Sequence, residues 1–110
     1  MSEKIYVLNA PILTSFGVFR YTQITVEQAK ELLQKPFISA IGHEGTAKFL
    51  TKLLGIEIPI NRVAIKMQPG DRAVVFQVLQ RLPEGVVLTE NELMKIPYSL
   101  GLLQMLSQST

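Results

Sequence analysis

The chain has 110 residues, of which 47% are hydrophobic and 18% are charged. It is long enough for one hydrophobic core, too apolar for intrinsic disorder, and without the ~20-residue apolar run that crosses a bilayer. We therefore expect a single domain over residues 1–110 and no membrane span.

The absence of cysteine and the single histidine exclude thiolate sites and multi-histidine metal sites within one chain. We therefore expect no metal and no cofactor. The formal net charge of +2 is too small to indicate capture of long nucleic acid. The first residues contain no secretory signal, which favours a cytoplasmic protein.

Two strands are predicted at the start of the chain, followed by a helix. Residues 4–10 (KIYVLNA) are apolar and β-branched, and residues 17–23 (GVFRYTQ) alternate with the period of a strand. Thr25 and Gln28 have the spacing of a capping box, in which a hydroxyl accepts from the third helical amide and the glutamine reaches back. This pattern predicts a first helix over about residues 25–35.

A second helix is predicted after the motif Gly-His-Glu-Gly-Thr at residues 42–46. Apolar residues recur at helical spacing from Ala47 to Leu54, and Gly55 suits the left-handed position that follows many helices. A short apolar stretch, residues 37–41, precedes the motif.

The second half of the chain predicts three strands and a short helix. Residues 62–67 (RVAIKM) and 72–79 (RAVVFQVL) are strand-like and are joined by Gln-Pro-Gly-Asp, which predicts a hairpin. A second capping-box pattern at residues 89–92 predicts a third helix that ends near Pro97. Residues 99–106 are apolar enough for a last strand, although periodicity over so short a run leaves a helix open. Five strands and three helices in mixed order predict an α/β domain with a five-stranded mixed sheet.

His43 is the first candidate for acid–base chemistry, because histidine is the side chain that ordinarily titrates near neutrality. It lies where the second helix is expected to begin. The unpaired amides and partial positive charge of a helix N-terminus suit a phosphate, and the adjacent glycines allow a ligand to approach the backbone. A surface or capping histidine with no further role explains the same position.

Two arginines, a glutamate and an asparagine are candidates for contact with a ligand. Arg81 and Glu84 lie in a loop with Pro and Gly, and an arginine can bind a phosphate through two parallel hydrogen bonds. A surface ion pair between them explains the same spacing, and the residues alone favour this reading. Arg62 lies at the expected start of a strand, and Asn9 lies at the end of one. Each could contact a ligand or be an ordinary surface or turn residue.

The usual nucleotide-binding and hydrolase motifs are absent from the sequence. It contains no phosphate-binding loop, no dinucleotide-binding glycine motif and no nucleophile elbow. With 7% aromatic residues and no Trp, a stacking platform for single-stranded nucleic acid is not expected either, which argues against a general RNase. A small ligand that carries phosphate remains compatible with the sequence.

Four segments, taken together, resemble a known family. They are Leu-Asn-Ala at 8–10, Ala-Ile-Gly-His-Glu-Gly-Thr at 40–46, Asn-Arg-Val at 61–63 and Gln-Arg-Leu-Pro-Glu-Gly at 80–85. The chain resembles, over about residues 4–106, the viral ring nucleases, small proteins of archaeal viruses, bacteriophages and integrative elements. Members are anti-CRISPR enzymes that destroy cyclic tetra-adenylate, the messenger of type III CRISPR immunity.

The resemblance implies an α/β homodimer with a cyclic tetra-adenylate pocket across the two subunits and metal-independent cleavage to linear di-adenylate. The site residues that it implies are His43, Arg81 and Glu84 for catalysis, and Asn9, Gly42, Thr46, Arg62 and Arg81 for ligand binding. Viral members follow the asparagine with a Ser-containing segment that also touches ligand, whereas this chain has Pro-Ile-Leu-Thr-Ser at residues 11–15. The alternative is a non-catalytic module of a mobile element that sequesters a cyclic nucleotide or binds a host protein.

Overall fold

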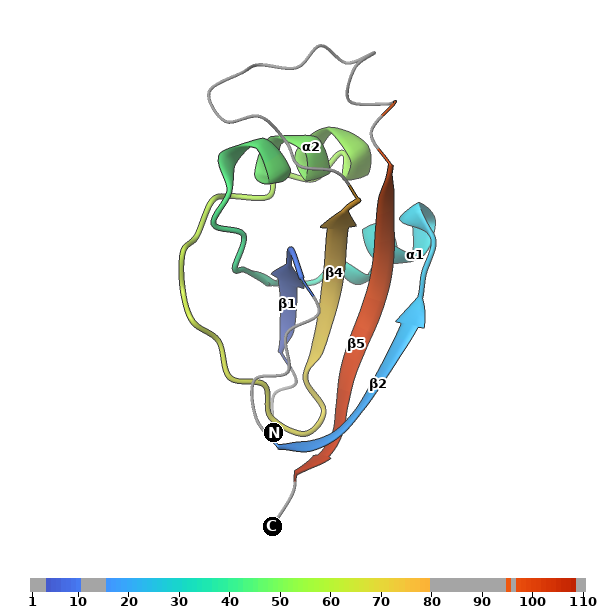
Figure 1. Cartoon of the computed structure of the whole chain (residues 1–110), viewed down its shortest axis with the longest axis vertical. Helices are drawn as coiled ribbons and strands as arrows, with labels where there is room; N and C mark the ends of the chain where they lie inside the picture. The colour runs from blue at the N-terminus through green and yellow to red at the C-terminus, as the bar shows by residue number, and fades with distance from the viewer. Residues whose placement is uncertain (1–3, 11–15, 80–94, 96, 109–110) are drawn as a thin grey trace.

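A five-stranded mixed sheet forms the centre of the computed structural model, which describes residues 4–10, 16–79, 95 and 97–108 (Figure 1). The strands are β1 (Ile5–Leu8), β2 (Gly17–Gln23), β3 (Ile38–Ser39), β4 (Arg72–Val78) and β5 (Tyr98–Gln108), in the order β2-β5-β4-β1-β3. β1 pairs in parallel with β3 and β4, whereas β5 runs antiparallel to β2 and β4. The predicted five-stranded mixed sheet is confirmed, and residues 99–106 form a strand and not a helix.

Both helices that the structure describes begin where the sequence predicts, but the first ends at Leu32, before the predicted end at about residue 35. α1 (Val26–Leu32) has Thr25 as its N-cap, with both hydrogen bonds of the capping box in place. α2 (Glu44–Leu54) ends at Gly55, which adopts a left-handed φ of 68°. Neither helix is long and apolar enough to cross a membrane. The predicted third helix falls mostly outside the described residues.

Both helices pack on one face of the sheet and share one hydrophobic core. α1 contributes Ala29, and α2 contributes Phe49 and Leu50, against Val74 and Phe76 of β4. The rings of Phe49 and Phe76 lie 5.2 Å apart at their centroids, an aromatic contact that anchors α2 to the upper part of the sheet (Figure 1). This packing holds the first turn of α2 in a defined place above the strands.

The second face of the sheet is covered by an irregular segment, and here the predicted hairpin is wrong. Residues 62–67 form no strand, although the turn that follows them is present, with Asp71 N donating to the Gln68 carbonyl over 2.9 Å. β4 already has β1 and β5 as its two neighbours, so no free edge remains for a further strand. Ile65 and Met67 instead pack on the side chains of the second face. The alternating pattern therefore reflects packing onto the sheet and not pairing within it.

The fifth strand comes from the apolar stretch at residues 37–41. Ile38 and Ser39 pair with β1 as a two-residue edge strand, at Tyr6 and Val7. Because β3 lies beside β1, it brings the chain that leads into α2 to the same end of the sheet as the end of β1.

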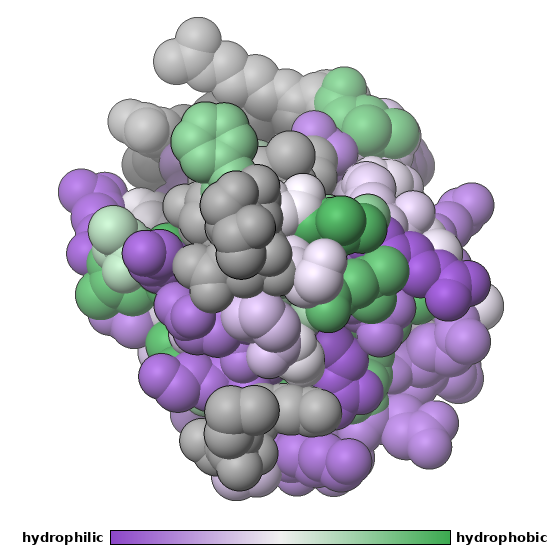
Figure 2. Space-filling model, turned by 90° about the horizontal axis from the view of Figure 1, so that it is seen from below, coloured by the Kyte–Doolittle hydropathy of each residue, from purple (hydrophilic) through white to green (hydrophobic). Residues whose placement is uncertain are grey.

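The opposite end of the sheet exposes several apolar side chains. Phe16 is 87% exposed and precedes β2, while Val18 of β2 and Leu106 of β5 are more than half exposed. Figure 2, which looks onto this end, shows hydrophobic side chains interspersed among hydrophilic ones. These residues lie at the far end of the strands from α2 and do not belong to the site described next.

Candidate functional site

The parallel strands bring two of the candidate residues to one edge of the sheet. β1, β3 and β4 run in the same direction, and their carboxyl ends point towards α2 (Figure 1). Asn9 follows β1 directly and is exposed, and His43 follows β3 by four residues. The carboxyl edge of parallel strands is where α/β sheets usually bind ligands. Arg81 and Glu84 lie outside the described residues.

His43 is the N-cap of α2. Its backbone is extended, with φ −115° and ψ 121°, and its Nδ1 accepts a hydrogen bond from the Thr46 amide over 3.2 Å. The histidine carbonyl accepts from Ala47 N over 3.0 Å, which starts the helical ladder. The capping role that the sequence left open is therefore confirmed. Asn, Asp, Ser and Thr are the residues that usually serve as caps, so capping alone does not account for an imidazole here.

The cap determines which ring nitrogen of His43 can act on a ligand. Since Nδ1 accepts from the Thr46 amide, the proton of the neutral ring belongs on Nε2. Thr46 Oγ1 lies 3.3 Å from Nδ1 and can accept from it when the ring is protonated on both nitrogens. Thr46 is buried, with 7% of its surface exposed. The structure thus places Thr46, expected to bind ligand, against His43, where its amide donates to the neutral ring and its hydroxyl is the acceptor within reach of a protonated Nδ1.

Arg62 lies against the residue that precedes His43, although Arg62 and His43 are 19 positions apart in the chain. Its Nε donates to the carbonyl of Gly42, the residue before His43, over 2.8 Å. The arginine is exposed. The sequence predicted Arg62 at the start of a strand. The structure instead places it in the irregular segment, next to Gly42, a candidate ligand-binding residue.

A set of hydrogen bonds that the sequence did not predict joins the segment before His43 to the segment before Arg62. Asn61 donates from its backbone N to Ile41 O and from Nδ2 to Ser39 O, both over 2.8 Å. Ser39 Oγ donates to Pro59 O over 2.6 Å and accepts from Ile41 N over 3.3 Å. The one signal in the sequence was the serine itself, the single hydroxyl in the apolar stretch at 37–41.

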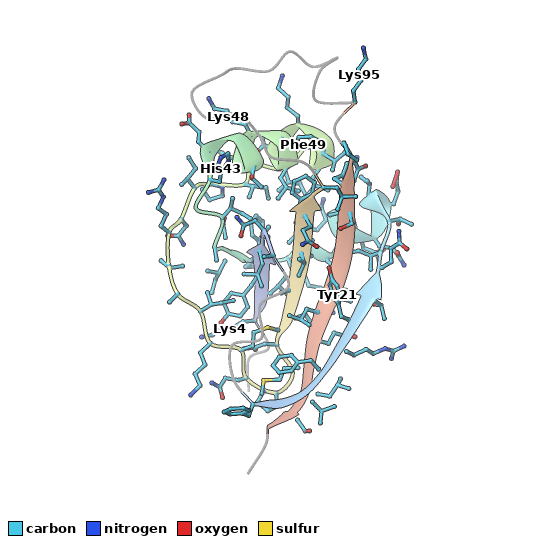
Figure 3. The ribbon with its side chains drawn as sticks, viewed as in Figure 1. Lys4, Tyr21, His43, Lys48, Phe49 and Lys95 are labelled. Carbon is cyan, nitrogen blue, oxygen red and sulfur yellow. The ribbon has the colours of Figure 1, made fainter. Side chains whose placement is uncertain are left out.

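The first turn of α2 adds the remaining charge at the site. Glu44 Oε1 and Lys48 Nζ form an exposed i,i+4 ion pair of 3.0 Å, which contributes little to stability. Figure 3 shows His43 at the start of α2 and Lys48 projecting from the helix away from the sheet. The amides of the first helical turn and the Arg62 guanidinium favour an anion. Within the described ranges, no group of three His, Asp or Glu residues is placed to hold a metal ion.

Sequence and structure comparisons point to the same family. A family model described as STIV B116-like matches residues 5–100. The uncharacterized protein 26 of Sulfolobus islandicus filamentous virus is 39% identical over 109 residues, covering 94% of this chain and 92% of that protein. The uncharacterized protein YddF of Bacillus subtilis is 38% identical over 103 residues, covering 91% of this chain and 95% of that protein.

A solved structure supports the same assignment. B116 of Sulfolobus turreted icosahedral virus (STIV) superimposes with a TM-score of 0.78 and 28% sequence identity, over 92% of this chain and 98% of that chain. On the family model and on these relatives, the chain belongs to the STIV B116-like family.

Proposed function

We propose that the protein is a metal-independent ring nuclease that cleaves cyclic tetra-adenylate to linear di-adenylate with a 2′,3′-cyclic phosphate, and so suppresses type III CRISPR signalling in the host cytoplasm. The observation that carries this proposal is the contact between Arg62 and the backbone of Gly42, next to His43. Two of the four segments behind the ring-nuclease resemblance, distant in the chain, meet there and form an anion-binding surface with one titratable donor.

The reaction needs a proton donor and positive charge, and these residues can supply both. The 2′-oxygen of one ribose attacks the adjacent phosphorus and loses its proton to solvent, while the bond to the 5′-oxygen of the next nucleotide breaks. His43, protonated on both nitrogens, donates its Nε2 proton to the leaving 5′-oxygen, and Thr46 Oγ1 accepts from Nδ1 meanwhile. Arg62, with the expected contribution of Arg81, stabilises the charge that builds on the phosphoryl oxygens. Glu84 orients the loop or the histidine, and Asn9 contacts the ligand.

A homodimer supplies the second cut. A two-fold axis brings two copies of His43 to opposite sides of a ring with matching symmetry. Ile60 and Val63, about half exposed, flank Arg62 in the chain, and Ile38 lies on the edge strand β3. These apolar residues next to the site support a subunit interface there, because two active centres must come close enough to share one ligand. An Ile60→Asp variant should elute as a monomer in size-exclusion chromatography.

Turnover distinguishes the enzyme from a protein that only sequesters its ligand. Incubated with a tenfold excess of cyclic tetra-adenylate, the wild-type dimer should convert all of it to linear product, whereas a sequestering protein removes one ring per dimer. Recovery of intact ring beyond that equivalent rejects the catalytic proposal.

The same assay in excess EDTA tests metal independence. A chain with no cysteine and one histidine offers few ligands to a transition metal, so the rate should not change. Loss of activity that magnesium or manganese restores would show that carboxylates hold a metal and would reject the acid–base scheme.

A further inference from the structure

We infer that Ser39 and Asn61 are positioning residues, which hold the Arg62 guanidinium beside His43 through the hydrogen bonds that join residues 39–42 to residues 59–62. The binding and kinetic test of this inference rests on the proposed ring-nuclease function. It goes beyond that function by assigning a role to two residues outside the expected catalytic and ligand-binding set.

The irregular segment has few attachments that could otherwise place Arg62. At its start, Ile58 N donates to Thr51 Oγ1 over 3.0 Å, and at its end Gln68 N donates to the Asp71 carboxylate over 2.8 Å. Between these two points the described residues form no strand ladder with the sheet. The bonds of Ser39 and Asn61 are therefore the polar contacts that set the path of the chain immediately before Arg62.

Ser39 forms the fixed side of this connection. It is 4% exposed, lies in β3 and pairs with Val7 of the interior strand β1. Its hydroxyl both donates to Pro59 O and accepts from Ile41 N, so both polar functions of the group are used. A buried hydroxyl is costly unless it is hydrogen-bonded, and here the bonds tie the irregular segment to the sheet.

Asn61 forms the other side and aligns the chain next to Arg62. Its backbone N and its Nδ2 bond to Ile41 O and Ser39 O, at alternate residues of the opposite segment. The next contact in the series is Arg62 Nε to Gly42 O. The three bonds join neighbouring residues of the two segments. Loss of the Nδ2 bond should therefore make the position of the Arg62 side chain less fixed while leaving its charge in place.

The first test compares Asn61→Ala and Asn61→Asp with a matched control in the full-length protein. Asn61→Asp keeps the size of the side chain but sets an acceptor against the Ser39 carbonyl. Thr51→Val removes both hydrogen bonds of the Thr51 hydroxyl, one to Ala47 O within α2 and one from Ile58 N at the start of the irregular segment, and leaves the contacts of Arg62 intact. Thermal unfolding should show losses of similar size for Asn61→Ala and Thr51→Val, which matches the two variants for stability.

For both Asn61 variants we expect about a tenfold rise in the dissociation constant for cyclic tetra-adenylate, with a smaller fall in kcat, because an arginine contact acts in the ground state. Thr51→Val should bind as wild type does. In the Asn61→Ala, Arg62→Ala double variant the loss should not exceed that of Arg62→Ala alone, since both changes remove the same contact. Fully additive losses, or equal losses for Thr51→Val, would overturn the inference.

The second test does not depend on activity. The Arg62 Nε–H resonance, measured by ¹⁵N NMR, should exchange slowly with solvent in the wild type and at least about tenfold faster in Asn61→Ala, because exchange requires the bond to Gly42 to open. Unchanged exchange in a folded Asn61→Ala variant would overturn the positioning role. If the wild type neither binds nor cleaves the ring, the proposed function fails, and this measurement alone decides the role of Asn61.

Discussion

Arg62 lies against Gly42 so closely that a side chain on the glycine would meet it. The arginine Nε donates to the glycine carbonyl over 2.8 Å, and a Cβ built on the glycine would lie 3.0 Å from Cγ of the arginine. Gly42 does not adopt a positive φ, unlike Gly55 and Gly70. The close approach of the arginine, and not the backbone conformation, therefore favours glycine at position 42. A substitution there should disturb the arginine contact without straining the backbone.

Gly42→Ala should weaken ligand binding without loss of stability. The added methyl pushes the arginine side chain away from the carbonyl, and the dissociation constant for cyclic tetra-adenylate should rise by about three- to tenfold. The backbone conformation at residue 42 accepts alanine. Alanine also lowers the conformational entropy of the unfolded chain, which stabilises the folded protein by about 0.4–1 kcal/mol and offsets the cost of the displaced arginine. Calorimetric titration and thermal unfolding measure the two effects. In an Arg62→Ala background the same substitution should change affinity no further; a second, independent loss would contradict this account.

Substitutions at His43 should separate the cap from the chemistry. His43→Ala removes the acceptor for the Thr46 amide and should cost about 1 kcal/mol of stability, whereas His43→Asn retains a capping oxygen and should cost little. Both should slow cleavage by roughly 100-fold or more, since neither side chain can donate a proton as imidazolium does. Ligand binding should be largely kept in both. A His43→Asn protein that cleaves at near wild-type rate would show that the histidine serves only as a cap.

The start of α1 and the end of α2 were predicted correctly because local chemistry defines them. The capping box at Thr25 and the left-handed Gly55 set the ends of the helices through hydrogen bonds within a few residues, and the structure confirms both. The predicted strand at 62–67 was wrong. Ile65 and Met67 have the alternating pattern of a strand, but their side chains pack on one face of the sheet. Whether an alternating segment pairs with a sheet or packs on it depends on which edges are free, and this is a property of the whole topology.

The candidate site likewise has a part that local sequence signals predicted and a part that they did not. His43 at the start of α2 was predicted from the glycines and from the helix that follows, both local signals. Its contact with Thr46 spans three residues. The approach of Arg62 to Gly42, and the bonds of Ser39 and Asn61, span about 20 residues and arise because β3 and the irregular segment lie side by side. No pattern within either segment alone predicts such a contact.

Thr46→Val should slow cleavage and Thr46→Ser should restore it. Valine keeps the backbone amide that bonds to Nδ1 but removes Oγ1, the acceptor available to the protonated ring. We expect a fall in kcat of about tenfold with little change in KM, because the hydroxyl acts on the proton donor and does not reach the ligand. Serine retains the hydroxyl without the methyl group. A rise in KM at constant kcat would instead assign Thr46 to ligand binding, as the resemblance implies.

Tyr6 and Asp71 give a test of the fold at high pH that is independent of any activity. Tyr6 is buried in β1, and its pKa is raised from the ordinary 10.0, first by burial and second by the charge of Asp71. Asp71 is buried as well, and its carboxylate accepts from Lys4 N over 3.0 Å and from Gln68 N over 2.8 Å. The carboxylate thus holds the start of β1 and the turn before β4 while opposing ionisation of the tyrosine.

Because the tyrosine pKa is higher in the folded protein, the unfolded chain releases this proton first as the pH rises. The contribution of Tyr6 to the free energy of unfolding is therefore complete below about pH 10 and decreases as the pH rises towards the folded pKa. Urea unfolding from about pH 8 to about pH 11 should show wild type losing more stability than Tyr6→Phe over the upper part of this range. In Asp71→Asn the pH-dependent part should be smaller, although the variant is less stable at every pH because one carboxylate oxygen no longer accepts. Parallel curves for wild type and Tyr6→Phe would contradict a raised pKa for Tyr6.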